Sequence, residues 1–306
     1  MRRLIISLPL LFCLLAAVSS CATISRAQLE AVSELTFRSD TVSRSPVVLF
    51  GELADIRLER GLFYAASLSS GTSRFDELTA LAEASMDDEV LVRKAGEYVD
   101  VFNSYVRALH SISSERRWKN IGTQMRGVGI RIDSVLYRYN RLDLLPDEVP
   151  LGYAKMTGRV LGYVAEEIIR AYQKEAVKNI VIMADTLVSA SCDSLMNILR
   201  SKEMNALIEH EKQSLRDNYS AYLNAMEAEG RCVPSEYDRR YVELVRKADG
   251  LSDVRNRCVS ALRSLKNAHA SLAESFAAGE KEVTMEQYED LVRLNRLAAR
   301  VAEALR

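Results

Sequence analysis

The chain of 306 residues has few of the residues that interrupt helices, few histidines and a single tryptophan. It contains 5 prolines, 13 glycines, 3 histidines and 1 tryptophan. Because the turns of multi-stranded folds need proline and glycine, this scarcity argues against such a fold and favours long helices. Basic side chains (41) nearly balance acidic ones (42). The net charge of −1 therefore gives no reason to expect nucleic acid as a partner.

Recognisable catalytic and metal-binding motifs are also missing. His210 is followed by Glu211, but position 214 is a serine, so the zinc pattern His-Glu-x-x-His is broken. No histidine has a glutamate three residues before it, as a di-iron bundle requires. No phosphate-binding glycine loop or serine-hydrolase pattern occurs. We therefore expect no enzymatic activity, no cofactor and no metal.

The cysteines exclude two further kinds of site. No two of them have Cys-x-x-Cys spacing, which excludes a zinc ribbon or a thioredoxin-type centre. Cys192, Cys232 and Cys258 follow the first 21 residues, and three cysteines cannot all pair within one chain. Outside the cytoplasm Cys232 and Cys258 are the favoured disulfide pair. The alternative is that all three are buried thiols that pack as small apolar side chains.

The first 21 residues have the pattern of an export signal. Two arginines follow Met1, and an apolar run then extends to residue 18, which is short for a membrane span. The sequence VSSC at 18–21 resembles the lipobox of bacterial lipoproteins: an aliphatic residue, two small residues and a cysteine. This resemblance covers the front of the chain only. An ordinary secreted protein or an uncleaved N-terminal anchor is the alternative.

The lipobox resemblance implies cleavage before Cys21 and acylation of that cysteine. Lasting attachment to a bilayer needs more than one acyl chain, which a multiply acylated cysteine provides, palmitate included. It also implies a location in the bacterial cell envelope. An alanine rather than an aspartate follows Cys21, which favours the outer membrane over the inner one.

Composition divides the chain into three parts. Residues 1–20 form the signal peptide. Residues 21–44 are polar and rich in serine and threonine, which predicts a lipid-anchored tether. Residues 45–306 predict one helical bundle domain, with a subdivision at 143–151 as an alternative because two of the five prolines fall there.

Local signals predict where the long helices begin and end. Three N-terminal patterns mark helix starts, namely Ser45-Pro46, Ser73 with Asp76, and Thr284 with Gln287. No glycine or proline occurs over 163–229, which predicts one long helix unless the serines and aspartate of 189–194 bend it. Helices over 235–278 and 285–305 follow.

Apolar residues in these segments recur at steps of three and four, the spacing of a seam that faces neighbouring helices. This predicts an all-α fold: an elongated antiparallel bundle of long helices with coiled-coil-like packing. His269 falls on such a seam, which favours a core imidazole over a metal ligand. The seams comprise Leu91, Ala95, Tyr98, Phe102, Tyr105 and Leu109; Ile169, Tyr172, Ala176, Ile180, Met183, Leu187 and Ala190; and Leu251, Val254, Cys258, Leu262, Leu265, His269, Leu272 and Phe276.

Two short stretches are candidates for interaction. Basic residues surround the only tryptophan in Arg116, Arg117, Trp118 and Lys119, which predicts contact with phospholipid headgroups, a glycan or an acidic partner. The alternative is a solvated helix start. Small residues recur every four positions in Ala154, Gly158 and Gly162. They predict close packing against another helix or, alternatively, a hinge or a partner-docking groove.

Together these features predict a lipid-anchored helical protein of the cell envelope that serves as a scaffold or binds a partner. Its expected partners are the membrane, through the N-terminal lipid, and a protein. A membrane-active protein similar in outline to long-helix pore-forming toxins is one alternative, although apolar runs such as 47–50 and 180–183 are too short to span a bilayer. An envelope enzyme without a recognisable motif is another.

Overall fold

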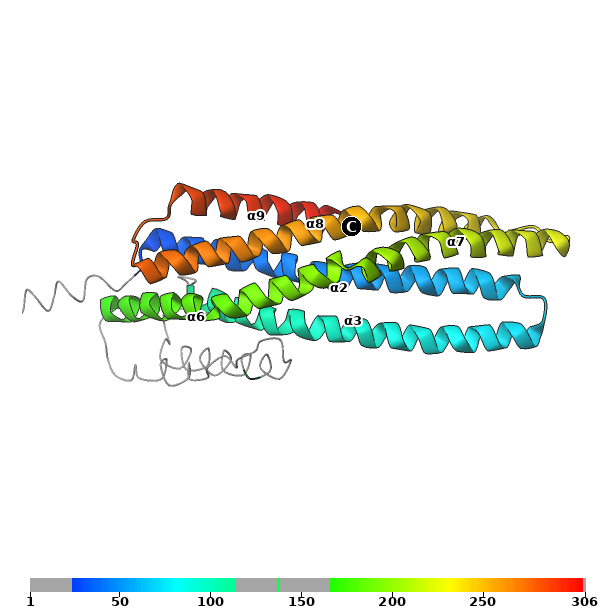
Figure 1. Ribbon diagram of the computed structural model, residues 1–306, viewed down its shortest axis with the longest axis horizontal. Coiled ribbons are helices and arrows are strands. Elements are labelled where there is room, and N and C mark those ends of the chain that lie inside the picture. The colour runs from blue at the N-terminus through cyan, green and yellow to red at the C-terminus, as the bar shows by residue number, and fades with distance from the viewer. Residues whose placement is uncertain (1–23, 114–136, 138–165, 305–306) are drawn as a thin grey trace, which may run out of the picture. The chain divides into compact units, whose positions relative to one another are not determined.

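The computed structural model describes residues 24–113, 137 and 166–304. No strand occurs among these residues, so the predicted all-α fold is confirmed, whereas the elongated form of the bundle stays a prediction. The helices are α2 (Arg26–Ser67), α3 (Gly71–Ser113), α6 (Glu166–Arg200), α7 (Lys202–Ala228), α8 (Ser235–Ala278) and α9 (Met285–Ala304) (Figure 1).

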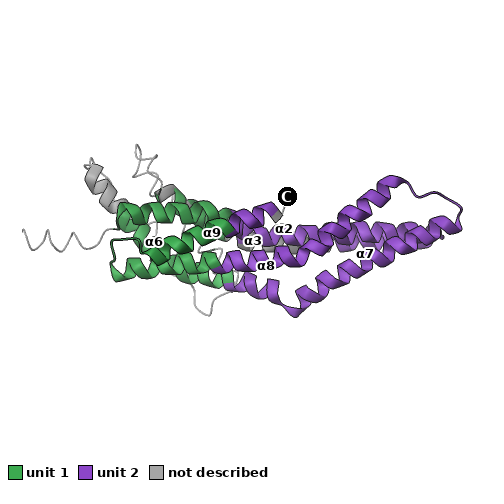
Figure 2. Ribbon diagram, turned by 90° about the horizontal axis from the view of Figure 1, so that it is seen from above, with its two compact units in different colours: residues 1–40, 101–192, 264–296 green, residues 41–100, 193–263, 297–306 purple. Residues whose placement is uncertain are grey.

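The chain forms two compact units, and most of the long helices contribute a stretch to each (Figure 2). Unit 1 comprises Met1–Asp40, Val101–Cys192 and Ser264–Arg296. Unit 2 comprises Thr41–Asp100, Asp193–Arg263 and Leu297–Arg306. Each unit has its own apolar core.

In unit 1 the core is built from faces of five helices, with buried residues three or four positions apart. Its largest fully buried side chains are Leu35, Leu109, Ile180, Leu187 and Phe276. In unit 2 the fully buried side chains include Leu49, Ile56, Leu199, Ile208 and Leu215.

Helix α2 starts far before the predicted position, which corrects the prediction of a tether over 21–44. Arg26 begins the helix, and Leu29, Val32 and Leu35 are buried in unit 1. These residues lie on one helical face, so burial of that face outweighs the low helix preference of the serines and threonines between them.

Pro46 lies inside α2 and does not begin a helix as predicted. A proline has no N–H to donate to the carbonyl four residues earlier, here that of Val42. The hydroxyl of Ser45 donates to that carbonyl at 2.6 Å. The vacant acceptor is thereby satisfied, and the helix continues to Ser67.

The helix predicted over 163–229 is interrupted at Ser201. It is therefore neither continuous nor bent at 189–194, the two outcomes that the sequence predicted. Helix α6 ends at Arg200, and the Ser201 hydroxyl accepts a hydrogen bond from the N–H of Met204 at 3.0 Å to cap α7. Residues 189–194, where a bend was predicted, stay within α6.

Most other helix ends agree with the local signals. Helix α8 has the predicted bounds, and Thr284 and Gln287 form the predicted reciprocal capping box of α9, with N···O distances of 3.0 and 3.2 Å. The start of α3 was predicted slightly late. Ser70, rather than Ser73, accepts the capping bond, from the N–H of Ser73 at 3.3 Å.

The predicted seams are largely buried where they can be followed. Phe102, Tyr105 and Leu109 are buried, as are the α8 residues except for the half-buried Val254. Met183 is an error in the prediction, because its side chain is 37% exposed. No helix among the described residues has an apolar stretch long enough to cross a membrane.

Candidate functional site

The interaction residues predicted from sequence lie outside the part of the chain that the structure describes. They are Cys21, the basic patch Arg116, Arg117, Trp118 and Lys119, and the small-residue stripe Ala154, Gly158 and Gly162. The alternative subdivision at 143–151 lies outside it too. Of the residues that line the candidate site, only Cys232 was named from the sequence, as a possible disulfide partner.

A groove of about 400 Å³ opens in unit 2 and is lined by residues of α2, α3, α7 and α8. The α2–α3 connection and the α7–α8 turn lie at the same end of this unit (Figures 1 and 2). We call it the aromatic groove. Its apolar wall consists of Leu62, Phe63, Ala66, Leu78, Met226 and Pro234, and the rings of Tyr222 and Tyr237 complete it.

Aromatic rings beside the groove join three helices. Phe63 of α2 meets Tyr219 of α7 edge-on, with ring centroids 4.8 Å apart. Tyr219 stacks on Tyr241 of α8 at 4.0 Å, and Tyr222 contacts Tyr237 at 5.7 Å. Each such pair contributes about 0.5–1.5 kcal/mol beyond the burial of its area. The ring cluster therefore fixes the wall of the groove.

Helix α7 brings its tyrosines to the groove through a regular buried stripe. The stripe repeats at steps of four and three, so all its members lie on one face of the helix. Its buried residues are Met204, Ile208, Glu211, Leu215, Tyr219, Tyr222 and Met226. The last of them, Met226, lies on the groove, two residues before the helix ends.

The hydroxyl of Tyr219 is held within the ring cluster. It donates a hydrogen bond to the Asp238 carboxylate of α8 at 2.5 Å. Burial raises the pKa of Tyr219 well above its usual value, and the bond to the negatively charged Asp238 raises it further. Tyr219 is therefore a neutral donor that ties α7 to α8.

The turn after α7 determines where two groove residues lie. Gly230 has a φ of +65°, the left-handed conformation that glycine adopts without strain. Its N–H donates to the carbonyl of Glu227, and the N–H of Arg231 donates to that of Met226, both at 2.9 Å. This is a Schellman motif, and it directs the chain so that Arg231 and Cys232 line the groove.

Three charged side chains line the groove: Glu59, Arg74 and Arg231. The Glu59 carboxylate accepts hydrogen bonds from Arg240 at 2.8 and 3.1 Å, which neutralises it. Burial raises the pKa of Tyr222, while the positive charges of Arg231 and Arg74 act in the opposite direction. Arg74, Arg231 and Tyr222 all line the groove.

A buried ion cluster supports α2 against α7 in the same unit. Glu211 is 1% exposed, and its carboxylate accepts hydrogen bonds from Arg57 at 3.0 Å and from Arg60. Burial raises the pKa of Glu211, but hydrogen bonds and charges from Arg60 and Arg57 outweigh it and keep that pKa below 4.5. The sequence signal was available, because a glutamate on an apolar stripe needs a buried partner.

His269 is a core residue in unit 1, as its position on a seam predicted. Its imidazole is buried and lies between two polar partners. The Tyr105 hydroxyl lies 2.8 Å from Nε2, and the Asp185 carboxylate lies 2.9 Å from Nδ1. Both ring nitrogens therefore have a hydrogen-bond partner. The hydrogen bonds from Tyr105 through His269 to Asp185 link α3, α8 and α6.

The remaining candidates for chemistry are not brought together. His210 is 65% exposed and lines no groove described in unit 2. No group of three or more potential metal ligands occurs among the described residues. Cys232 is exposed whereas Cys258 is buried, so the favoured disulfide between them is not formed.

A second groove of about 430 Å³ lies in unit 1 and is lined by residues from the first three turns of α2 and α9. Its acidic residues are Glu30, which pairs with Arg26 on the same helix, and Glu34, which pairs with Arg38 and accepts a bond from Asn295. Because these charges are already matched, this groove has less capacity than the aromatic groove to select a charged ligand.

Comparison with known proteins identifies no relative. The chain matches no protein-family model, and no curated protein and no solved structure resembles it significantly.

Proposed function

We propose that this protein is a lipid-anchored helical module of the bacterial cell envelope that binds a partner protein through an apolar surface of unit 2. The lipobox-like sequence VSSC at 18–21 supports the anchor and the location, with the outer membrane favoured. The exposed apolar residues of α2 and α3 carry the binding part of the proposal.

Five of these residues lie within 58–62 of α2 and 75–86 of α3. On α2, Leu58 and Leu62 are one turn apart, and on α3 Phe75, Leu78 and Met86 share one face. We call these five residues the α2–α3 apolar surface. Phe75 is 68% exposed, although burial of a phenylalanine side chain is favourable by about 1.5–3 kcal/mol.

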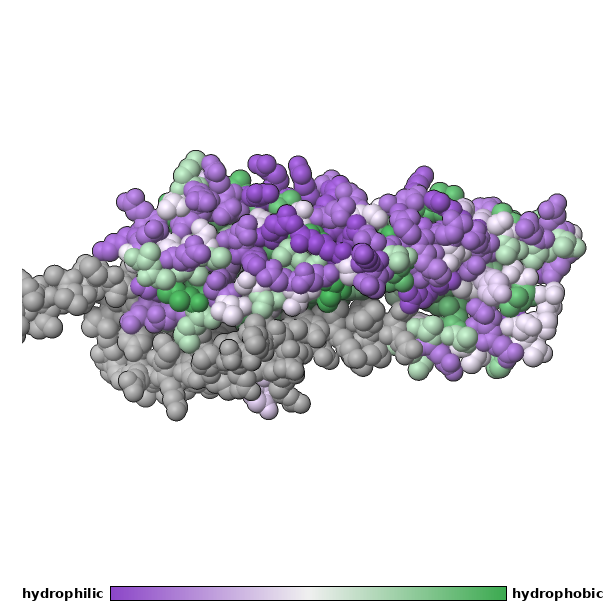
Figure 3. All heavy atoms as spheres, in the orientation of Figure 1, coloured by the Kyte–Doolittle hydropathy of each residue, from purple (hydrophilic) through white to green (hydrophobic). Residues whose placement is uncertain are grey.

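The two helices lie side by side at this surface. A Cβ atom built on Gly61 would lie 2.5 Å from a methyl group of Leu81, so the absent side chain lets α3 approach α2. Elsewhere, on the face drawn in Figure 3, hydrophilic side chains predominate and hydrophobic ones are scattered. Leu62 of α2 and Leu78 of α3 line the same groove. Clusters of exposed apolar residues are typical of protein interaction sites.

Site-specific photocrosslinking in cells tests the proposal. A photoreactive phenylalanine analogue replaces Phe75 in the full chain, with a matched control at Met285 of α9, which is 70% exposed. We expect one discrete adduct from position 75 and none of that size from position 285. The variant Leu78→Asp should abolish the adduct, because a carboxylate opposes burial of the surface.

Two outcomes would contradict the proposal. Crosslinks from positions 75 and 285 that have the same products would show general exposure instead of a binding surface. An adduct unaffected by Leu78→Asp would show that the α2–α3 apolar surface does not make the contact.

A further inference from the structure

The aromatic groove of unit 2 combines an apolar wall with positive charge that the described residues leave unmatched. Arg74 makes no ion pair with any described residue. Arg231 pairs only with Glu229, on the surface and with both side chains about half exposed or more. Such exposed pairs are weak, so the Arg231 guanidinium is available to another anion.

The one carboxylate in the groove does not compete for these arginines. Glu59 is held by Arg240, whose guanidinium also bonds Asp55 at 3.3 Å. A cationic ligand would thus meet two arginines and no vacant carboxylate. A neutral apolar ligand would leave both arginines unused, whereas an anion would use both.

Size and wall indicate a small amphiphile. A volume of about 400 Å³ falls within the roughly 300–1,000 Å³ of small-molecule sites, which are mostly apolar with a few polar groups that orient the ligand. An extended apolar body suits Leu62, Leu78, Met226 and the ring of Tyr222. The arginine fork suits a carboxylate, which it can bind through two parallel hydrogen bonds.

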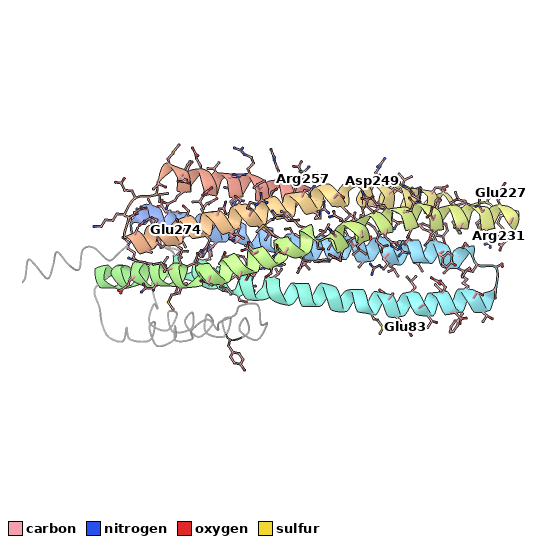
Figure 4. All side chains as sticks on the ribbon, viewed as in Figure 1. Glu83, Glu227, Arg231, Asp249, Arg257 and Glu274 are labelled. Carbon is pink, nitrogen blue, oxygen red and sulfur yellow. The ribbon has the colours of Figure 1, made fainter. Side chains whose placement is uncertain are left out.

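The surroundings of the groove disfavour an anionic bilayer as the source of that ligand. Figure 4 labels Glu227 and Arg231 at the end of α7. Exposed carboxylates flank the lining residues on α3 and α8 and at the end of α7, and they repel an extended anionic surface while leaving room for one anion inside. They are Asp76, Glu227, Glu229, Glu236 and Asp238.

We propose that the aromatic groove binds a free long-chain carboxylate, with its apolar chain against the wall and its carboxylate between Arg74 and Arg231. This goes beyond partner binding. The groove shares Leu62 and Leu78 with the α2–α3 apolar surface, but Phe75 and Met86 lie outside the groove lining, and Arg74 and Arg231 lie outside the apolar surface.

Cys232 supplies a direct test because it lines the groove and is exposed, whereas Cys192 and Cys258 are buried. The test uses the chain from residue 21 onward with Cys21→Ser, so that Cys232 is its one exposed thiol among described residues. The rate at which N-ethylmaleimide modifies Cys232 is measured by mass spectrometry with dodecanoate, with dodecanol or with neither.

We expect saturating dodecanoate to slow the modification of Cys232 about ten-fold and dodecanol, which lacks the charge, to require a much higher concentration. The double variant Arg74→Ala and Arg231→Ala should weaken dodecanoate binding by about ten-fold or more, as measured by titration calorimetry. Arg239→Ala is the matched control. Arg239 is exposed and lies two residues after the groove residue Tyr237, but it does not line the groove itself.

Three results would overturn the inference. One is equal protection by dodecanol and dodecanoate, and another is unchanged affinity in the double variant. The third is protection by phosphatidylglycerol vesicles but not by dodecanoate, which would assign the arginines to a membrane surface. Circular dichroism checks that the variants keep their helices, as expected for exposed side chains. Crosslinking from position 75 is read separately, so either proposal can fail without the other.

Discussion

Glu211 is a carboxylate on the apolar stripe of α7, and its removal tests how the unit holds α2. In Glu211→Gln, Arg57 and Arg60 lose their ion pairs with this carboxylate. Loss of one partner from a buried pair costs roughly 3–5 kcal/mol, but both arginines retain partial access to water. We therefore expect unfolding free energy to fall by about 2 kcal/mol, measured by urea denaturation at pH 7.

The same carboxylate predicts a pH dependence. Because the folded-state pKa of Glu211 lies below 4.5, its contribution is present above that pH and is lost as pH falls through the lowered value. Wild type should lose stability there, and Glu211→Gln should lack this part of the loss. The control Glu209→Gln removes an exposed partner of Lys212 and should follow wild type. If the stability of wild type and of Glu211→Gln fell with pH by the same amount, Glu211 would not be the group responsible.

The hydrogen bonds of His269 should contribute to the stability of unit 1. In Tyr105→Phe the buried imidazole loses the partner of Nε2, 2.8 Å away. An unsatisfied buried polar group costs about 1–3 kcal/mol, so thermal and urea unfolding should shift accordingly. Tyr288→Phe removes the hydroxyl of an exposed tyrosine and should change stability by less than about 0.5 kcal/mol.

At the scale of elements, α2 depends on the pairing of Ser45 with Pro46. Ser45→Ala leaves the Val42 carbonyl without its donor and should cost about 1–2 kcal/mol. In the Pro46→Ala background the cost should be smaller, because an N–H at position 46 can then bond that carbonyl. A double-mutant cycle by urea denaturation measures the difference, and additive effects would refute this explanation of the proline.

Two glycines of α2 form a matched pair. Gly51 has open space where a Cβ would lie, so Gly51→Ala should stabilise the protein by about 0.5–1 kcal/mol. At Gly61 the added methyl would press on Leu81, which must move, and the gain should be largely cancelled. Equal gains in thermal unfolding would show that the approach of α3 to α2 at Gly61 is not close.

Helix ends were predictable where a few neighbouring residues determine them. Thr284 and Gln287 cap α9 through contacts within one turn, and Gly230 ends α7 through its own backbone conformation. The start of α2 was not predictable in this way. Leu29, Val32 and Leu35 have helical spacing, but only the other helices of unit 1 decide that this face is buried.

The aromatic groove could not be predicted from the sequence. Its residues come from α2, α3, α7 and α8, which are distant in the chain, and periodicity does not give the register between helices. Tyr219 and Tyr222 could be assigned to a buried stripe, whereas their contacts with Phe63 and Tyr237 could not. Arg74 and Arg231 likewise look like ordinary surface residues until the fold places them in one groove.

For the whole protein, the proposed function depends on attachment to a membrane. A lipid on Cys21 would keep the helical units at a membrane, so that the α2–α3 apolar surface meets envelope partners at high local concentration. Without that lipid the proposed function loses its compartment, although the two unit cores would be unaffected.

The mass of the mature protein, purified from bacterial membranes and measured intact, tests this claim most directly. We predict a chain that begins at Cys21 and carries added acyl mass, which disappears together with membrane association in Cys21→Ala. A mature chain that begins at another residue, or one that begins at Cys21 without acyl mass, would contradict the lipid anchor and with it the proposed function.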